Sequence, residues 1–337
     1  MLLLTNLSLA IVLFFGGRMT VLFTITPGDF VAFVSYLGLL TWPMMALGWV
    51  TNLIQRGRAS LERVHAILER RADIRDAADA EALERPRGEL RFEGVAFAYG
   101  GGSGSAEALR GVDLVVPAGS SLGIVGPPGS GKSTLLQLIP RLYDPGRGRV
   151  CLDGRPVDRI RLSDLRRAIA SMPQDAFLFA GTIRDNIGFG DPELTDERLA
   201  AAAEAAALLA TVRSFPNGFD TVVGERGVML SGGQKQRVAL ARCLLADAPV
   251  LVLDDPISQV DFETGAAVTR TIRALAGRRT LVIASHRLSA LAFADRIVVL
   301  DEGRVTAAGT HDELMRTSDY YARTWRLQEI EEGVHAA

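Results

Sequence analysis

At 337 residues the chain is long enough for more than one folded unit, and its hydrophobic content of 48% with a mean hydropathy of +0.19 indicates that part of it meets lipid. The 37 basic and 39 acidic residues nearly cancel to a formal charge of -2, and no long block of one sign appears, so the composition offers no basis for binding nucleic acid. The two cysteines, Cys151 and Cys243, form neither a CxxC motif nor a metal-ligand pair, and we expect reduced cytosolic thiols.

The apolar excess is concentrated in residues 1–70 and predicts two membrane helices. Residues 1–17 are uncharged, Arg18 interrupts, and residues 19–26 are apolar again; residues 30–50 are 21 uncharged residues, enough to cross a hydrocarbon core of about 30 Å. We expect a turn at residues 26–29. A signal peptide is the alternative for the first run, but that run lacks a basic leading region and a second span follows at once.

Basic residues after the second run predict how the two helices are oriented across the membrane. Arg56, Arg58 and Arg63 follow Val50, within a stretch of helical periodicity that ends near residue 71. The N-terminus and everything after about residue 55 are therefore expected in the cytoplasm. The prediction is a multi-pass protein of the cell (inner or plasma) membrane, in contact with the lipid bilayer.

Three segments divide the chain. Residues 1–70 form the membrane part with its cytoplasmic extension, residues 71–88 form a polar linker with Pro86 and Gly88, and residues 89–330 alternate short β-rich runs with helical stretches, as an α/β domain does. An alanine-rich stretch from Thr195 to Arg213 predicts an inserted helix with Thr195 as its N-cap.

A phosphate-binding loop is predicted where "GPPGSGKST" follows an apolar strand and precedes a helix. Glycines let backbone N–H groups approach phosphates, Lys132 supplies a positive charge, and the Ser133 hydroxyl suits Mg²⁺. The residues expected to bind nucleotide here are Gly126, Gly129, Ser130, Gly131, Lys132, Ser133 and Thr134. The strand 250–254 ends in Asp254, the expected second ligand of Mg²⁺. Together these motifs predict a P-loop NTPase with ATP and Mg²⁺ as cofactors.

A second anion-binding element lies at residues 230–245. In "LSGGQKQRVALARCLL" Ser231 can cap the helix, and Gly232 and Gly233 leave bare backbone at its start. The phosphate loop already accounts for one nucleotide, so this second anion-binding element implies a second nucleotide. Here the sequence resembles the ATP-binding cassette (ABC) transporters, whose signature LSGGQ it matches at all five positions through Gln234.

The resemblance covers residues 90–315 and implies the fold: a RecA-like core with a β-subdomain and an inserted α-helical subdomain. It also implies that each signature closes over ATP bound to a partner domain. Four further positions match family motifs: Tyr99 the adenine-stacking aromatic, Gln174 the Q-loop residue that senses Mg²⁺ and γ-phosphate, His286 the switch histidine, and Asp261 the D-loop acid. The segment "TVVGERG" resembles the exporter X-loop, with Glu225 retained and Val222 in place of the usual Glu.

Fusion of membrane helices ahead of the cassette, together with the X-loop, resembles the multidrug-type exporters. Such half-transporters usually have six membrane helices, so the resemblance implies an N-terminally truncated chain; a membrane-anchored, non-transporting ATPase is the alternative. The expected function is ATP-driven export of drug-like or lipid-like amphiphiles.

The residue after Asp254 departs from the family pattern, because Asp255 replaces the usual glutamate that orients or deprotonates the attacking water. Its carboxylate is one methylene shorter and retreats by about an ångström, a displacement that can slow a reaction about 10²-fold. Either Asp255 still supports ordinary but slower hydrolysis, or the chain is the degenerate subunit of a heterodimer. The heterodimer is the favoured interpretation, with a homodimer as the other arrangement. A regulatory subunit that binds ATP and gates its partner is the alternative function.

Overall fold

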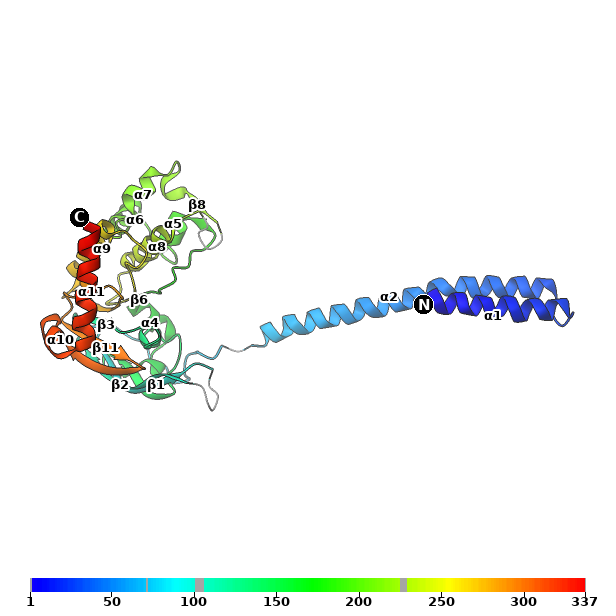
Figure 1. Ribbon diagram of the computed structural model, residues 1–337, viewed down its shortest axis with the longest axis horizontal. Coiled ribbons are helices and arrows are strands. Elements are labelled where there is room, and N and C mark those ends of the chain that lie inside the picture. Colours follow the sequence, from blue (N-terminus) through cyan, green and yellow to red (C-terminus); the bar gives the residue numbers. More distant parts are fainter. Residues whose placement is uncertain (1, 71, 101–105, 225–228, 337) are drawn as a thin grey trace. The chain divides into compact units, whose positions relative to one another are not determined.

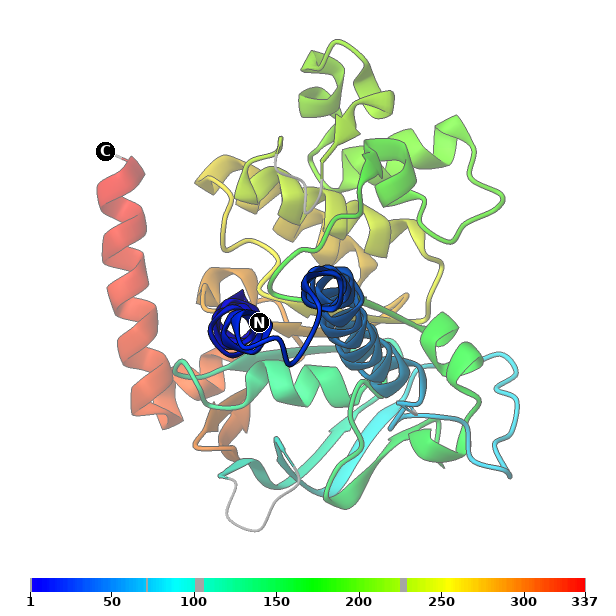
Figure 2. The same cartoon turned by 90° about the vertical axis from the view of Figure 1, so that its right-hand side faces the viewer.

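The computed structural model describes residues 2–70, 72–100, 106–224 and 229–336, and the chain divides into two compact units, Met1–Asp73 and Ile74–Ala337. The first unit is a helical hairpin, formed by α1 (Leu2–Val21) and α2 (Pro27–Leu68). The two helices lie side by side along the first part of α2 (Figures 1 and 2).

The expected turn at residues 26–29 is wrong, because these residues begin α2. The Thr26 hydroxyl accepts a hydrogen bond from the Asp29 N–H (3.2 Å), and the Asp29 carboxylate accepts one from the Thr26 N–H (3.1 Å). This reciprocal capping box, with Pro27 at the first helical position, fixes the helix start. The reversal of the chain therefore lies in the preceding residues 22–25.

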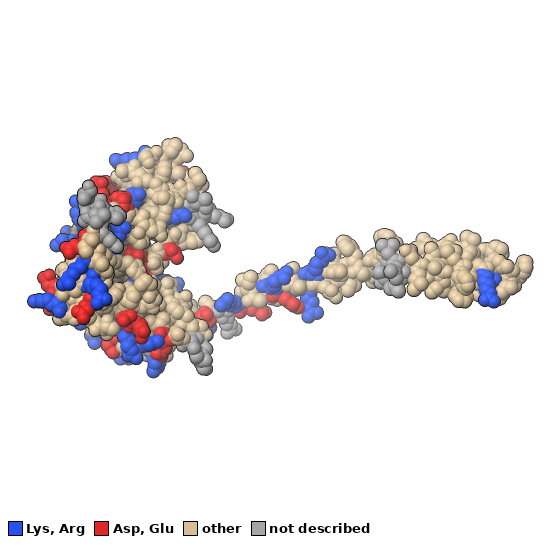
Figure 3. All heavy atoms as spheres, viewed as in Figure 1, with Lys and Arg blue, Asp and Glu red and all other residues tan. Residues whose placement is uncertain are grey.

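The hairpin presents apolar side chains outward. Within the described residues α2 alone is long and apolar enough to cross a membrane, whereas the apolar stretch of α1, Thr5–Val21, is shorter. None of the residues of α2 is buried, and Figure 3 shows charged side chains gathered along its later part. One predicted span therefore has the required length, and the other stays a prediction.

The second unit is built on two sheets. A six-stranded sheet has the order β12-β11-β3-β10-β9-β6, parallel except for β12, and an antiparallel sheet has the order β2-β1-β4-β5. The strands of the first sheet are β3 (Ser121–Val125), β6 (Ile169–Met172), β9 (Val250–Asp254), β10 (Thr280–Ala284), β11 (Arg296–Asp301) and β12 (Arg304–Gly309). Those of the second are β1 (Leu90–Ala98), β2 (Glu107–Val116), β4 (Arg147–Leu152) and β5 (Arg155–Pro156).

Strands β3, β9 and β10 are buried at every position, which explains their uninterrupted apolar runs. The shorter elements around the sheets are α3 (Lys132–Leu138), η1 (Val157–Arg159), α4 (Leu162–Ala168), α9 (Phe262–Leu275), η4 (Leu288–Ala290), α10 (His311–Thr317) and α11 (Asp319–Ala336). This is the expected α/β cassette: a parallel core with an antiparallel β-subdomain.

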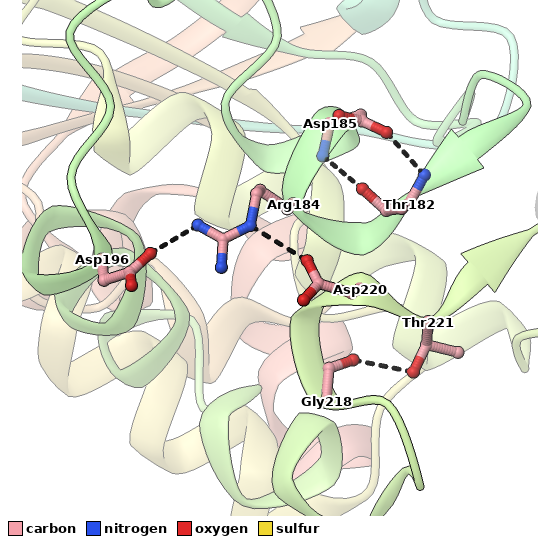
Figure 4. A network of polar contacts seen from close by, with 7 residues as sticks. All are labelled: Thr182, Arg184, Asp185, Asp196, Gly218, Asp220 and Thr221. Carbon is pink, nitrogen blue, oxygen red and sulfur yellow. Dashed lines mark hydrogen bonds and ion pairs between the residues drawn. The ribbon is translucent and has the colours of Figure 1, made fainter.

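A helical group inserts between β6 and β9, and Figure 2 shows it at the end of the cassette opposite the antiparallel sheet. It contains β7 (Gly181–Thr182), α5 (Ile183–Ile187), α6 (Asp196–Ala205), α7 (Leu209–Ser214), η2 (Gly218–Asp220), β8 (Val222–Val223) and α8 (Gly232–Leu245). Arg184 of α5 joins two of these elements, since it donates to Asp196 (2.5 Å) and to Asp220 (3.1 Å) (Figure 4). Both hydrogen bonds raise the pKa of Arg184, and the one to Asp196 contributes most.

Thr195 caps α6 as predicted, with its hydroxyl accepting from the Arg198 N–H (3.3 Å). The single helix expected from Thr195 to Arg213 is wrong, because it breaks after Ala205. Ala207 adopts a left-handed conformation (φ 52°), and the Leu208 N–H donates back to the Ala203 carbonyl (2.7 Å), which is a helix-ending Schellman arrangement. Arg237 of α8 holds the Ala207 carbonyl at 2.6 Å, a contact distant in sequence.

Residues 74–88, assigned above to the linker, pack on the cassette. The Glu81 N–H donates to the Arg159 carbonyl (2.8 Å). The Asp153 carboxylate accepts hydrogen bonds from the N–H groups of Arg87, Gly88 and Glu89 at 2.7–3.0 Å. The cassette unit therefore begins near residue 74 rather than at residue 89.

Candidate nucleotide-binding site

Strand order brings the predicted motifs to one edge of the parallel sheet. β10 lies between β3 and β9, with Ala284 paired in register with Ile124 on one side and with Asp254 on the other. The carboxyl ends of these three strands lead into the phosphate loop, into Asp254 with Asp255, and into the segment of His286. They meet because parallel strands all end at the same edge, where α/β proteins bind their ligands.

The phosphate loop needs glycine at two positions for steric reasons. Gly131 has φ 101°, and a Cβ there would lie 2.6 Å from the Ala108 carbonyl oxygen. At Gly126 a Cβ would collide with the Leu300 carbonyl oxygen of β11. Gly131 is the N-cap of α3, so the N–H groups of the first helical turn lack intrahelical partners and are suited to phosphate oxygens.

Lys132 is buried at the centre of this loop. Its Nζ donates to the carbonyl oxygens of Gly126 (2.8 Å) and Pro127 (3.0 Å). Burial lowers the pKa of Lys132, while the charges of Asp254 and Asp255 oppose that shift. A bound phosphate would supply the negative charge that a buried ammonium lacks.

Asp254 ends β9 beside the loop and is itself buried. Burial raises the pKa of Asp254, a hydrogen bond from Ser133 lowers it, and the charge of Asp255 raises it further. A divalent cation would relieve this burial of negative charge. The Asp254 carboxylate and the Ser133 hydroxyl are oxygen donors of the kind that Mg²⁺ accepts, and this ion usually takes one or two protein ligands beside phosphates.

Asp255 follows in a left-handed conformation (φ 52°) and is only 4% exposed. Its Oδ1 accepts from the Ser285 hydroxyl (3.0 Å) and from the His286 N–H (3.4 Å). One oxygen of the short carboxylate is therefore engaged by the segment after β10. The sequence interpretation missed Ser285, and its only signal was its place directly before His286.

The loop and the strand ends enclose a cleft of about 360 Å³. Its lining includes these predicted site residues: Tyr99, Gly129, Ser130, Gly131, Lys132, Ser133, Thr134, Gln174, Asp254, Asp255 and His286. Ser130 Oγ is buried and has no hydrogen-bond partner within the described residues. The cleft thus joins a phosphate cradle, oxygen donors for Mg²⁺ and a carboxylate, a donor set that fits MgATP.

Tyr99 lies at the mouth of the cleft, 46% exposed. Its hydroxyl lies 2.9 Å from Thr134 Oγ1 and donates to Gln137 (3.2 Å), while the rings of Phe97 and Tyr143 contact it edge-on. The ring is therefore held in place at the mouth, where a base could stack on it.

The signature residues lie apart from this cleft. Ser231 caps α8, accepting from the Gln234 N–H (3.3 Å), and Gln234 Oε1 accepts from the Ser231 N–H (2.9 Å). A Cβ on Gly232 or Gly233 would collide with Gln259. Ser231, Gly232, Gly233 and Gln234 are therefore close-packed at a helix start but absent from the lining of this chain's own cleft.

Asp261 is also outside the cleft, where it caps α9 by accepting from the Thr264 N–H (2.9 Å). That backbone hydrogen bond lowers the pKa of Asp261. Gln174 lines both the cleft and a second hollow beside Gly232. Glu225 of the X-loop resemblance lies outside the described residues, and Val222 is exposed on β8.

A second residue missed from the sequence is Gln236 of α8, which is 2% exposed. Its Nε2 donates to the Asp255 carbonyl (2.6 Å) and to Ser258 Oγ (2.9 Å), and its Oε1 accepts from the Gln259 N–H (3.1 Å). This side chain connects the signature helix to the segment after Asp254. Nothing in the local sequence pattern marks it.

Comparison with known proteins agrees with this geometry. A family model described as "ABC transporter" matches residues 109–258. An ATP-dependent lipid A-core flippase of Chromohalobacter salexigens is 41% identical over 326 residues, covering 97% of this chain and 56% of that protein. The Escherichia coli multidrug resistance-like ATP-binding protein MdlA is 39% identical over 322 residues, covering 96% of this chain and 54% of its own length.

A solved structure, of a bacterial Atm1-family ABC exporter with ATP bound, matches with a TM-score of 0.76 and 39% identity over 90% of this chain and 53% of that one. The chain spans about half the length of the curated relatives it matches.

Proposed function

Because this chain carries an ABC transporter ATP-binding domain, we propose that it is the ATP-binding and ATP-hydrolysing subunit of a membrane exporter. The observation that carries the proposal is the cleft in which Lys132, Asp254 and His286 meet beside Tyr99. The membrane-length helix α2, which precedes the cassette in the chain, supports an anchor in the lipid bilayer. ATP binding would bring two cassettes together, and hydrolysis would let them separate.

Each residue of the cleft has a role that its surroundings support. Lys132 and the first turn of α3 would bind the phosphates, and Ser133 and Asp254 would hold Mg²⁺. Gln174 and His286, which line the same cleft, would contact the terminal phosphate. MgATP supplies the phosphoanhydride bond that is broken. The signature residues at the start of α8 act on the nucleotide of a partner subunit, a role supported by their absence from this chain's own cleft.

We further propose that the chain's own site hydrolyses ATP slowly and that its partner is a different subunit with a glutamate in place of Asp255. The side chain is short, and Ser285 and His286 already engage one of its oxygens. These hydrogen bonds hold the carboxylate towards β10, which limits its use as a base. The same observation favours the second candidate, a regulatory subunit that binds ATP and gates a competent partner.

The cargo is proposed from the relatives. One similar protein is named for lipid A-core and another for multidrug resistance, which supports a lipid-like or drug-like amphiphile. The location that follows is the cell membrane, with the cassette in the cytoplasm.

The test is Mg²⁺-dependent ATP turnover by the purified chain in lipid nanodiscs, alone and with a candidate partner. The variants are Asp255→Glu, Ser285→Ala and Lys132→Ala, and binding of a fluorescent ATP analogue is measured for each. We expect the unmodified chain to bind ATP but turn it over slowly alone, Asp255→Glu to raise that rate about tenfold or more, and Lys132→Ala to lose binding. Equal rates for the unmodified chain and Asp255→Glu would exclude a degenerate site, and absence of analogue binding would exclude the ATP-binding function itself. Ser285→Ala tests the tethering separately from the length of the side chain, because it removes the Ser285 hydrogen bond to the Asp255 carboxylate, leaves that of the His286 N–H, and does not lengthen the side chain.

A further inference from the structure

The C-terminal helix α11 is fixed to the cassette by aromatic contacts at its start. Tyr321 is fully buried, its hydroxyl lies 2.9 Å from His311 Nδ1, and the His311 ring packs against Trp325 at 4.4 Å between centroids. Burial raises the pKa of Tyr321 to about 12, so its hydroxyl stays protonated. These contacts set both the position and the rotation of α11.

Gln328 lies on the same face of α11, because residues 321, 325 and 328 follow the helical spacing i, i+4, i+7. Its Nε2 donates to the His286 carbonyl (2.6 Å), and its Oε1 accepts from the Leu288 N–H (2.8 Å). The opposite face exposes Leu327 and Ile330. One side-chain amide therefore holds the backbone on both sides of Arg287, forty residues away in sequence.

The held segment carries the switch histidine. On the cleft side, Ser285 donates to Asp255, and the Arg287 N–H donates to the Ser285 hydroxyl (3.1 Å). On the opposite side Gln328 alone of the described α11 side chains is hydrogen-bonded to residues 286–288. A backbone fixed from both sides can present the exposed His286 side chain to the cleft in one position.

We propose that Gln328 is a positioning residue for ATP turnover, through which helix α11 sets the position of the switch histidine. The inference rests on the proposed ATPase function. A side-chain amide suits the task because it offers one donor and one acceptor in a fixed geometry, which matches the carbonyl and the N–H it meets. An alanine loses both bonds, and a glutamate keeps the acceptor but loses the donor.

The experiment uses the full chain in nanodiscs with Asp255→Glu as the parent, because turnover of the mixed dimer would report mainly the partner's site. The variants Gln328→Ala and Gln328→Glu are each added to this parent. Glu329→Ala, at the next and exposed position of α11, is the matched control. Three quantities are measured: kcat and KM for ATP, the melting temperature, and hydrogen exchange of the Leu288 amide. We expect Gln328→Ala to speed exchange of that amide about fivefold or more, and to lower kcat about threefold to tenfold with KM unchanged within about twofold. Gln328→Glu should lower kcat similarly, and Glu329→Ala should match the parent.

If Gln328 had a purely structural role, Gln328→Ala would lower the melting temperature and the amount of folded protein without a selective loss of kcat. The proposal is overturned if Leu288 exchanges at the parent's rate in Gln328→Ala, or if exchange quickens while kcat does not change. If the Asp255→Glu parent shows no turnover at all, the proposed function fails, and the exchange of Leu288 still decides whether Gln328 holds the segment.

Discussion

Replacing Gln236 by alanine tests whether one buried amide joins the signature helix to the segment after β9. Gln236 makes three hydrogen bonds, to the Asp255 carbonyl, to Ser258 Oγ and from the Gln259 N–H. Each such bond contributes about 0.5–1.5 kcal/mol net, so the three together contribute roughly 1.5–4.5 kcal/mol.

The surroundings of Gln236 determine how much of that stability is lost when its side chain is removed. The Asp255 carbonyl keeps a second donor, Ser258 Oγ at 3.2 Å, so the variant leaves mainly the Gln259 N–H without a partner. Gln236 and Gln259 also line an open hollow, where water can replace part of what is lost. We therefore expect Gln236→Ala to lower the free energy of unfolding by about 2 kcal/mol, or roughly 4–8 °C in the melting temperature of a domain of this size.

The assay is thermal unfolding of the nucleotide-free chain, followed by intrinsic fluorescence. Arg270→Ala, at an exposed position of α9, is the control and should shift the transition by less than about 0.5 kcal/mol. Gln236→Glu keeps the acceptor for Gln259 but loses the donor, so it should also destabilise. If Gln236→Ala melts together with the control, the three hydrogen bonds do not stabilise the cassette and the reasoning fails.

Three further predictions concern the nucleotide site. Gly131→Ala should weaken binding of a fluorescent ATP analogue about tenfold or more, because the new Cβ meets the Ala108 carbonyl at φ 101°; affinity within twofold of the unmodified chain would contradict this. Burial raises the pKa of Asp254 above its unfolded value of 3.8, so the folded state binds more protons in the window above 3.8 and stability falls as pH rises through it. The melting temperature of Asp254→Asn should therefore rise relative to that of the unmodified chain as pH increases, and the variant should lose the stabilisation by MgATP. If the melting temperatures of the two proteins change in parallel with pH, the prediction is refuted. Ser231→Ala should cost about 1 kcal/mol of stability through loss of the α8 cap yet leave the ATP affinity of this chain unchanged, and weakened binding would show that Ser231 acts in its own cleft.

The sequence determined the features that depend on neighbouring residues. The spacing of "GPPGSGKST" between an apolar strand and a helix predicted the phosphate loop, because glycine conformation and helix-start donors are local properties. Thr195 and Ser231 were recognised as caps for the same reason. The start of α2 follows from the same local chemistry, since Thr26 and Asp29 form a capping box, although Pro27 and Gly28 are also typical of turns.

Only the tertiary structure decided which side chains support the site. Ser285 reaches Asp255 across 30 residues and Gln328 reaches His286 across 42, because β10 lies beside β9 and α11 packs against η4. Where the expected helix breaks, the Ala207 carbonyl likewise accepts a hydrogen bond from Arg237 of another helix. Such contacts follow strand order and helix packing, and they leave no periodic pattern in the chain from which they could be read.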